Sequence, residues 1–179
     1  MSAALTPGAA PARARILSRA AFETRMLLAN GEQLLVSLIL PSLALVGLTL
    51  TSVPDLGPGA RADLALAGAL ALCVVSTAFT GQAIGTGFDR RAGVLRLLGT
   101  TPLGRSGLLA AKALAVLSVL GVQVVVIGAI GVALGARAQP AGLVPAALTL
   151  LLGSACFVAL ALLLAGTLRA EAVLALANL

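Results

Sequence analysis

Residues 113–136 read ALAVLSVLGVQVVVIGAIGVALGA, a run that contains no charged side chain and whose most polar members are Ser118 and Gln123. A helix of about 20 apolar residues is long enough to cross the hydrocarbon core of a bilayer. The run is continuously apolar rather than alternating, which favours a helix over a strand of a membrane barrel. The sequence therefore predicts a transmembrane helix, at about 108–135.

Three other uncharged runs surround this one, at residues 33–54, 64–88 and 138–168. Each is long enough for one more spanning helix, at about 33–53, 64–87 and 141–168. Residues 172–179 are apolar again and predict the start of a fifth span, with a short amphipathic tail on the membrane surface as the alternative. We thus expect an all-α, polytopic helical membrane protein that forms a single domain over 1–179 and is truncated within its fifth span.

The composition of the whole chain indicates the same class. Apolar residues make up 60% of the 179 residues, charged residues make up 10%, and the mean hydropathy is +1.11. A soluble domain of this length needs more charged residues to cover its surface. The composition therefore excludes a soluble globular protein.

Most of the 12 Lys and Arg side chains lie in two blocks, at residues 13–25 and 90–112. Basic residues accumulate on the cytoplasmic side of inner-membrane proteins, so we expect both blocks, and the N-terminus, in the bacterial cytoplasm. Within 13–29, most apolar residues share one helical face, and the opposite face carries Arg15, Arg19, Glu23 and Arg25. This pattern predicts an amphipathic helix that lies in the membrane interface with its polar face towards water.

Several kinds of chemistry are excluded by what the sequence lacks. There is no His, and Cys73 and Cys156 have no partners at metal-ligand spacing, so we expect neither a Ser-His-Asp or Cys-His catalytic group nor a metal. No G-x-x-x-x-G-K-[ST] motif occurs, so the chain is not expected to bind ATP, to hold a cofactor directly or to be an enzyme by itself. With no Trp or Tyr to stack on bases, a nucleic-acid partner is not expected either.

The predicted spans contain uncharged polar side chains, of which Gln82 and Gln123 are the strongest hydrogen-bonding groups. Either they belong to a transport path or they hydrogen-bond neighbouring helices, and the sequence leaves both open. The spans hold no carboxylate, which argues against a proton-coupled secondary transporter. Two Gly-x-x-x-Gly pairs, at 81–85 and 131–135, match a helix-packing pattern, but this Gly content produces such pairs by chance.

The segment between the second and third spans, 88–107, combines basic and apolar residues. Residues 90–98 predict a short helix that ends at Gly99, after which Thr101 caps the next helix and Pro102 occupies its first position. A helix–break–helix on the cytoplasmic face suits the docking of a partner protein. Anchoring to lipid headgroups is the alternative.

Residues 88–103 read FDRRAGVLRLLGTTPL, which resembles the cytoplasmic loop of ABC-2 type transporter permeases, with a pattern close to F-x-R-R-x-G-x-L-x-x-L-x-x-T-P-L. The resemblance implies the permease subunit of an ATP-binding cassette exporter, dimerised with a second permease. In this family the loop couples to a separate P-loop ATPase subunit, which hydrolyses the ATP. The matching residues of the coupling element are Phe88, Arg90, Arg91, Gly93, Leu95, Thr101 and Pro102.

Family members usually have six spans, which is why the resemblance also implies a truncated chain. Two other classes remain open. A secondary transporter requires an ionisable residue embedded in the membrane, whereas a membrane scaffold requires only helix packing and has no ATPase partner.

Overall fold

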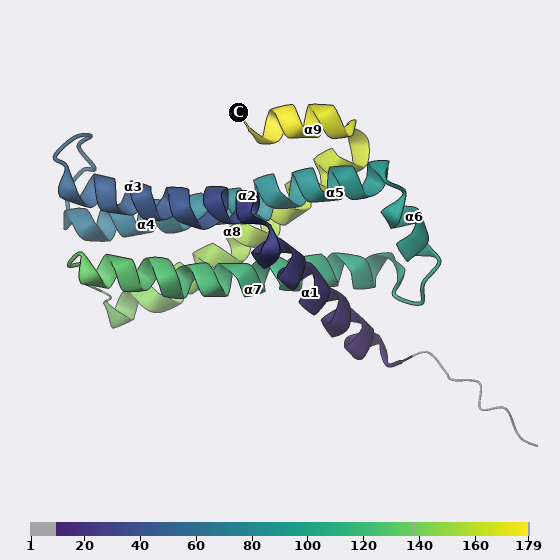
Figure 1. Cartoon of the computed structure of the whole chain (residues 1–179). Coiled ribbons are helices and arrows are strands. Elements are labelled where there is room, and N and C mark those ends of the chain that lie inside the picture. Colours follow the sequence, from purple (N-terminus) through teal and green to yellow (C-terminus); the bar gives the residue numbers. More distant parts are fainter. Residues whose placement is uncertain (1–9, 138, 179) are drawn as a thin grey trace, which may run out of the picture.

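The computed structural model describes residues 10–137 and 139–178, and within them the regular structure is entirely helical (Figure 1). The predicted domain 1–179 and the predicted fifth span 172–179 extend past this part of the chain. Residues 1–9 and 179 of those predictions lie outside the described residues.

Four continuous helical rods are long and apolar enough to cross a membrane, which confirms the predicted number of spans among the described residues. The rods are Gly31–Leu50 (α2 Gly31–Leu34, η1 Leu35–Ile39, α3 Leu40–Leu50), Arg61–Arg91 (α4 Arg61–Val74, η2 Val75–Gly81, α5 Gln82–Arg91), α7 Gly104–Ala133 and α8 Pro140–Thr167. The η segments are π-helical, with one extra residue per turn. The second rod extends past the predicted 64–87 at both ends, because the charged residues that bounded the prediction continue the helix.

The rods end at short turns on one side of the molecule, between α3 and α4 and between α7 and α8, and we call this side the turn end. In the α3–α4 turn, Gly57 and Gly59 have φ angles of 93° and 134°, which L side chains rarely adopt. Charged groups close the chain there: Arg61 Nε donates to the Leu48 carbonyl at 2.6 Å, and the Arg137 amide donates to Asp63 Oδ1 at 2.7 Å.

Small side chains let the rods approach closely. Ala65, Ala69 and Ala78 of the second rod are buried, with Val116 and Ile127 of α7 in the same core. Many larger apolar side chains point outward instead, among them Leu43, Val125, Leu152 and Leu163. An apolar exterior of this kind is suited to lipid.

Only one glycine of each Gly-x-x-x-Gly pair makes a close contact in the described structure. A Cβ on Gly131 would lie 2.9 Å from Leu66 Cδ1, and one on Gly81 would lie 2.7 Å from the Gln33 amide nitrogen. A Cβ on Gly85 or on Gly135 would meet no described atom within 4 Å. The pairs therefore do not act as two-residue packing motifs within this chain.

Three further helices lie at the opposite side, which we call the α6 end: α1 Ala12–Ala29, α6 Val94–Gly99 and α9 Ala170–Ala177. Figure 1 shows α1 crossing α7 obliquely, and α9 turning back from the end of α8 to run alongside α5. The segment predicted as an amphipathic helix, 13–29, thus lies within α1. The helix α9 contains most of the predicted 172–179.

Candidate functional site

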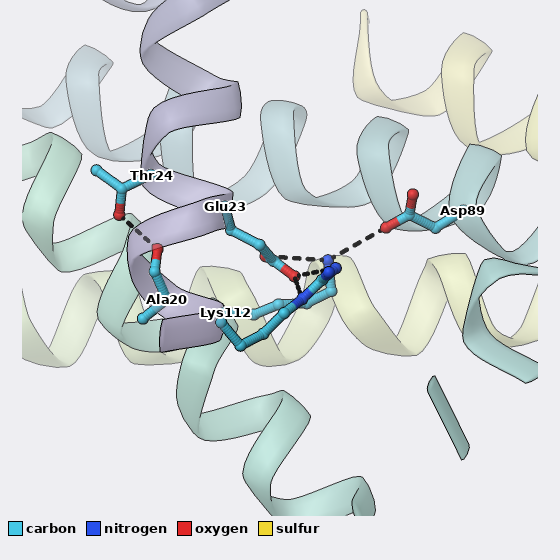
Figure 2. Close-up of polar contacts among 6 residues, drawn as sticks. Ala20, Glu23, Thr24, Asp89 and Lys112 are labelled. Atoms are coloured by element: carbon cyan, nitrogen blue, oxygen red, sulfur yellow. Dashed lines mark hydrogen bonds and ion pairs between the residues drawn. The ribbon is translucent and has the colours of Figure 1, made fainter. Parts of the chain in front are cut away.

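Four ionisable side chains meet where α1, α5 and α7 approach one another at the α6 end. Lys112 Nζ lies 3.3 Å from Glu23 Oε2 and 3.5 Å from Asp89 Oδ2, as Figure 2 shows. Arg19, one helical turn before Glu23, contributes a second cation, with its Nη2 2.8 Å from Glu23 Oε1. We call these four residues, Arg19, Glu23, Asp89 and Lys112, the charge cluster.

The charge cluster is buried at its centre and open at one edge. The side chains of Lys112 and Glu23 are 5% and 8% exposed, whereas that of Asp89 is 33% exposed. Two positive and two negative charges balance, which burial of ionised groups requires. Because its members come from three helices, the cluster fixes α1 to both the second rod and α7.

Two residues of the charge cluster lie at the ends of uncharged runs of the sequence. Asp89 directly follows the run 64–88, and Lys112 directly precedes the run 113–136. Since consecutive spans are antiparallel, both residues reach the same boundary between apolar and charged surface. Glu23 reaches it from α1, where the neighbouring Thr24 Oγ1 donates to the Ala20 carbonyl at 2.8 Å; Figure 2 draws this contact.

The sequence pattern did not reveal this cluster. It placed Glu23 on the polar face of its helix, together with the arginines, but in the structure Glu23 and Ala20 form the buried face of α1. Glu23 can be buried because Arg19 and Lys112 both lie within ion-pair distance of its carboxylate and offset part of the cost of removing it from water. The only local signal was the i, i+4 spacing of Arg19 and Glu23. The predicted position of α1 in the membrane interface stays a prediction.

The predicted helix over 90–98 is interrupted in the structure. The helix α5 continues to Arg91, and Gly93 then takes a left-handed conformation with a φ of 76°, so that α6 begins at Val94. Thr101 Oγ1 donates to the Leu98 carbonyl at 2.6 Å and therefore closes the end of α6. It does not cap the next helix, α7, which begins at Gly104 rather than at Pro102.

The seven residues assigned to a coupling element separate into different surroundings. Arg90 Nη1 donates to the carbonyls of Ala165 and Leu168, both at 3.1 Å, and Arg91 Nη1 lies 2.5 Å from Glu171 Oε1. Both arginines thus bind the joint between α8 and α9. The remaining five are Phe88, Thr101 and Pro102, which are exposed, and Gly93 and Leu95, which are half-buried.

Thr101 and Pro102 border a cavity of about 640 Å³ between α1 and the turn that precedes α7. From α1 the cavity is lined by Arg15, Arg19 and Phe22, among others. Arg15 Nη1 donates to the Pro102 carbonyl, which holds the turn against α1.

Gln123 joins the two π-helical segments. Its Nε2 donates to the Ser37 carbonyl in η1 at 2.8 Å and to Thr77 Oγ1 in η2 at 2.9 Å. A π-helical turn displaces backbone carbonyls from the regular ladder, so an inserted amide is an effective partner. The geometry gives Gln123 a role in helix packing.

Gln82 lies on the second rod between this contact and the charge cluster. Its side chain is buried, and its Oε1 has no hydrogen-bond partner among the described residues. Neither Gln82 nor Gln123 lines the cavities described at the α6 end. A role of either residue in a transport path stays a prediction.

Among residues 10–137 and 139–178, no three His, Cys, Asp or Glu side chains are grouped as a metal site. Comparisons of the chain with protein-family models, with curated proteins and with solved structures find no match. The features of the chain that bear on function are therefore the geometry of the α6 end and the loop pattern of residues 88–103.

Proposed function

We propose that this chain is the permease subunit of an ATP-driven exporter of the bacterial inner membrane, working with a separate P-loop ATPase and a second permease. The observation that carries the proposal is the charge cluster at the base of the 88–103 segment. Lys112 connects α1, α5 and α7, so a displacement of α6 by a partner is transmitted to two rods at once. A docking element that drives reorientation of spans needs such a rigid connection.

In this proposal the α6 end lies on the cytoplasmic side of the membrane. Both blocks of basic residues lie at that end, together with the N-terminal side of α1. Leu17, Phe22 and Met26 of α1 are more than half exposed, which favours contact of this helix with the lipid interface. The helix α9 turns back along α5, antiparallel to α8, as the start of a fifth span would (Figure 1).

The docking surface for the ATPase would combine α6 with the cavity beside α1. Leu97 of α6 is 70% exposed, and Arg96 lies next to it. An exposed leucine beside an arginine would suit a partner that offers an apolar contact with an acidic rim. Thr101 and Pro102, which line the cavity, extend this surface towards α1.

Co-purification in mild detergent, with mass spectrometry of the bound proteins, tests this function. We expect a stoichiometric P-loop ATPase with the unmodified chain and at least about tenfold less with Leu97→Glu, because an interface leucine contributes about 1.5–3 kcal/mol. The matched control is Val53→Glu, since Val53 is 77% exposed but lies at the turn end. Reproducible absence of the ATPase, or equal recovery with both variants, contradicts the proposal.

The same charge cluster favours one alternative, a proton-coupled secondary transporter. Glu23 and Asp89 supply carboxylates at the boundary of the spans, which the uncharged runs themselves lack. Transport that persists after ATP depletion but stops when the proton gradient is collapsed would favour this alternative over the exporter.

A further inference from the structure

We propose that a cavity at the joint of α5, α8 and α9 binds the phosphate group of an anionic phospholipid. The cavity has a volume of about 360 Å³. Its lining includes three arginines, Arg90, Arg91 and Arg169, and one carboxylate, Glu171. This site does not depend on the proposed exporter function, because it uses neither α6 nor an ATPase.

The arginines of the cavity are only partly neutralised within the chain. Arg90 is held by two backbone carbonyls, and no carboxylate among the described residues lies within ion-pair distance of Arg90 or Arg169. Arg91 alone has a carboxylate partner, Glu171, in an exposed pair. The lining thus carries three positive charges against one negative, an arrangement that attracts an anion and suits the planar guanidinium groups to phosphate oxygens.

The ends of two helices also lie at the cavity. The helix α9 begins at Ala170, a lining residue, and no side chain caps its first turn. The amide groups of a first turn have no partner inside the helix and carry a partial positive charge. They act in the same direction as the three arginines, whereas Glu171 in the first turn of α9 and the C-terminal end of α8, which also lines the cavity, act in the opposite direction. The preference for an anion therefore depends on the arginines.

The position of the cavity along the rods favours a lipid as the source of the phosphate. The uncharged run of the second rod ends just before residues 89–91, and that of α8 ends at Arg169. Both helices thus leave the apolar zone at the level of the cavity, which is where phospholipid phosphates lie. Leu163 of α8 and Leu174 of α9, close to the cavity in sequence, are exposed apolar side chains available to acyl chains.

Lipid titration of the full chain in detergent micelles, followed by native mass spectrometry, tests the site. Phosphatidylglycerol should bind more tightly than phosphatidylcholine with the same acyl chains. Arg169→Gln should weaken phosphatidylglycerol binding about fivefold, equivalent to about 1 kcal/mol. Glu171→Gln should strengthen it, because it removes the only carboxylate of the lining.

Arg105→Gln is the matched control, since Arg105 is an exposed arginine of the α6 end outside this cavity. Equal binding of the two lipids, or equal effects of Arg169→Gln and Arg105→Gln, would overturn the proposal. Inorganic phosphate alone distinguishes the source of the group. If inorganic phosphate binds as tightly as phosphatidylglycerol and is weakened equally by Arg169→Gln, the ligand of the cavity is a soluble phosphate compound and the assignment to a lipid is wrong.

Discussion

The ion pair between Lys112 and Glu23 should stabilise the attachment of α1 to the rods, and a double-mutant cycle can measure this. The cycle consists of Glu23→Gln, Lys112→Met and the double variant, all close in volume to the native residues. Each single substitution leaves the other side chain of the pair buried and charged without this partner, whereas the double substitution removes both charges. We therefore expect the double variant to be more stable than the sum of the single effects predicts.

The geometry sets the size of the effect. At the observed 3.3 Å, two unit charges attract by about 5 kcal/mol at an effective dielectric constant of about 20. Desolvation offsets much of this, and removing one partner of a buried pair usually costs about 3–5 kcal/mol. Here Glu23 keeps Arg19 and Lys112 keeps Asp89, so each single variant should lose about 2–3 kcal/mol and the coupling should exceed about 1.5 kcal/mol.

Unfolding by SDS in detergent micelles, followed by far-ultraviolet circular dichroism, measures these free energies. Circular dichroism is appropriate because the chain has no Trp or Tyr to report by fluorescence. An independent probe is the labelling rate of Cys73, which is buried in α4, in a Cys156→Ser background. Faster labelling in the single variants than in the double variant would agree with the cycle.

The chain also contains a matched control. Arg91 and Glu171 lie only 2.5 Å apart, but their side chains are 63% and 66% exposed. Exposed pairs contribute about 0–1 kcal/mol, so the cycle of Arg91→Gln and Glu171→Gln should give a coupling below about 1 kcal/mol. If the buried pair couples no more strongly than this exposed pair, the reasoning about the charge cluster fails.

Two further predictions concern contacts between the rods, and the same unfolding measurement checks both. Gln123→Leu removes the donor to the Ser37 carbonyl and should lower the free energy of unfolding by about 1–2 kcal/mol; an unchanged value would mean that the contact adds nothing. In Gly131→Val the added Cβ would lie 2.9 Å from Leu66 Cδ1, so this variant should lower the free energy of unfolding by about 1–3 kcal/mol. The matched variant Gly128→Val has open space around the added Cβ and should lower it by about 0.5 kcal/mol or less. Equal effects at the two glycines would contradict the contact between α4 and α7.

The spans were predictable because each depends on a local property of the chain. A long, uncharged, apolar run favours a helix long enough to cross a membrane, and the four rods follow these runs. The turn at 51–60 was also predictable, since Gly57 and Gly59 supply the backbone conformations that it needs. In both cases neighbouring residues contain all the necessary information.

The contacts at the α6 end were not predictable in this way. Glu23 and Lys112 are 89 positions apart, and their pairing depends on how α1 crosses α7. The π-helical segments η1 and η2 contain Ser and Thr side chains that also occur in regular helices, and Gln123, which binds both segments, lies far from them in the chain. The break at Gly93 is a smaller error: a glycine in a basic helical segment was read as part of the helix, although its φ of 76° ends α5.

The contacts of Arg90 and Arg91 with α8 and α9 also change which basic residues are available to a protein partner. A count of positive charges by segment treats all arginines of the α6 end alike, but Arg90 and Arg91 contact the α8–α9 joint rather than the surface of α6. For Arg96 no side-chain hydrogen bond or ion pair occurs within the described residues, and it lies beside Leu97, which is exposed. Docking on α6 should therefore depend on Arg96 and Leu97. Substitution of Arg90 or Arg91 should instead loosen α9 from α5. Such a variant should increase the exposure of the α8–α9 joint and should change the binding of a partner to α6 less than substitution of Arg96 or Leu97 does.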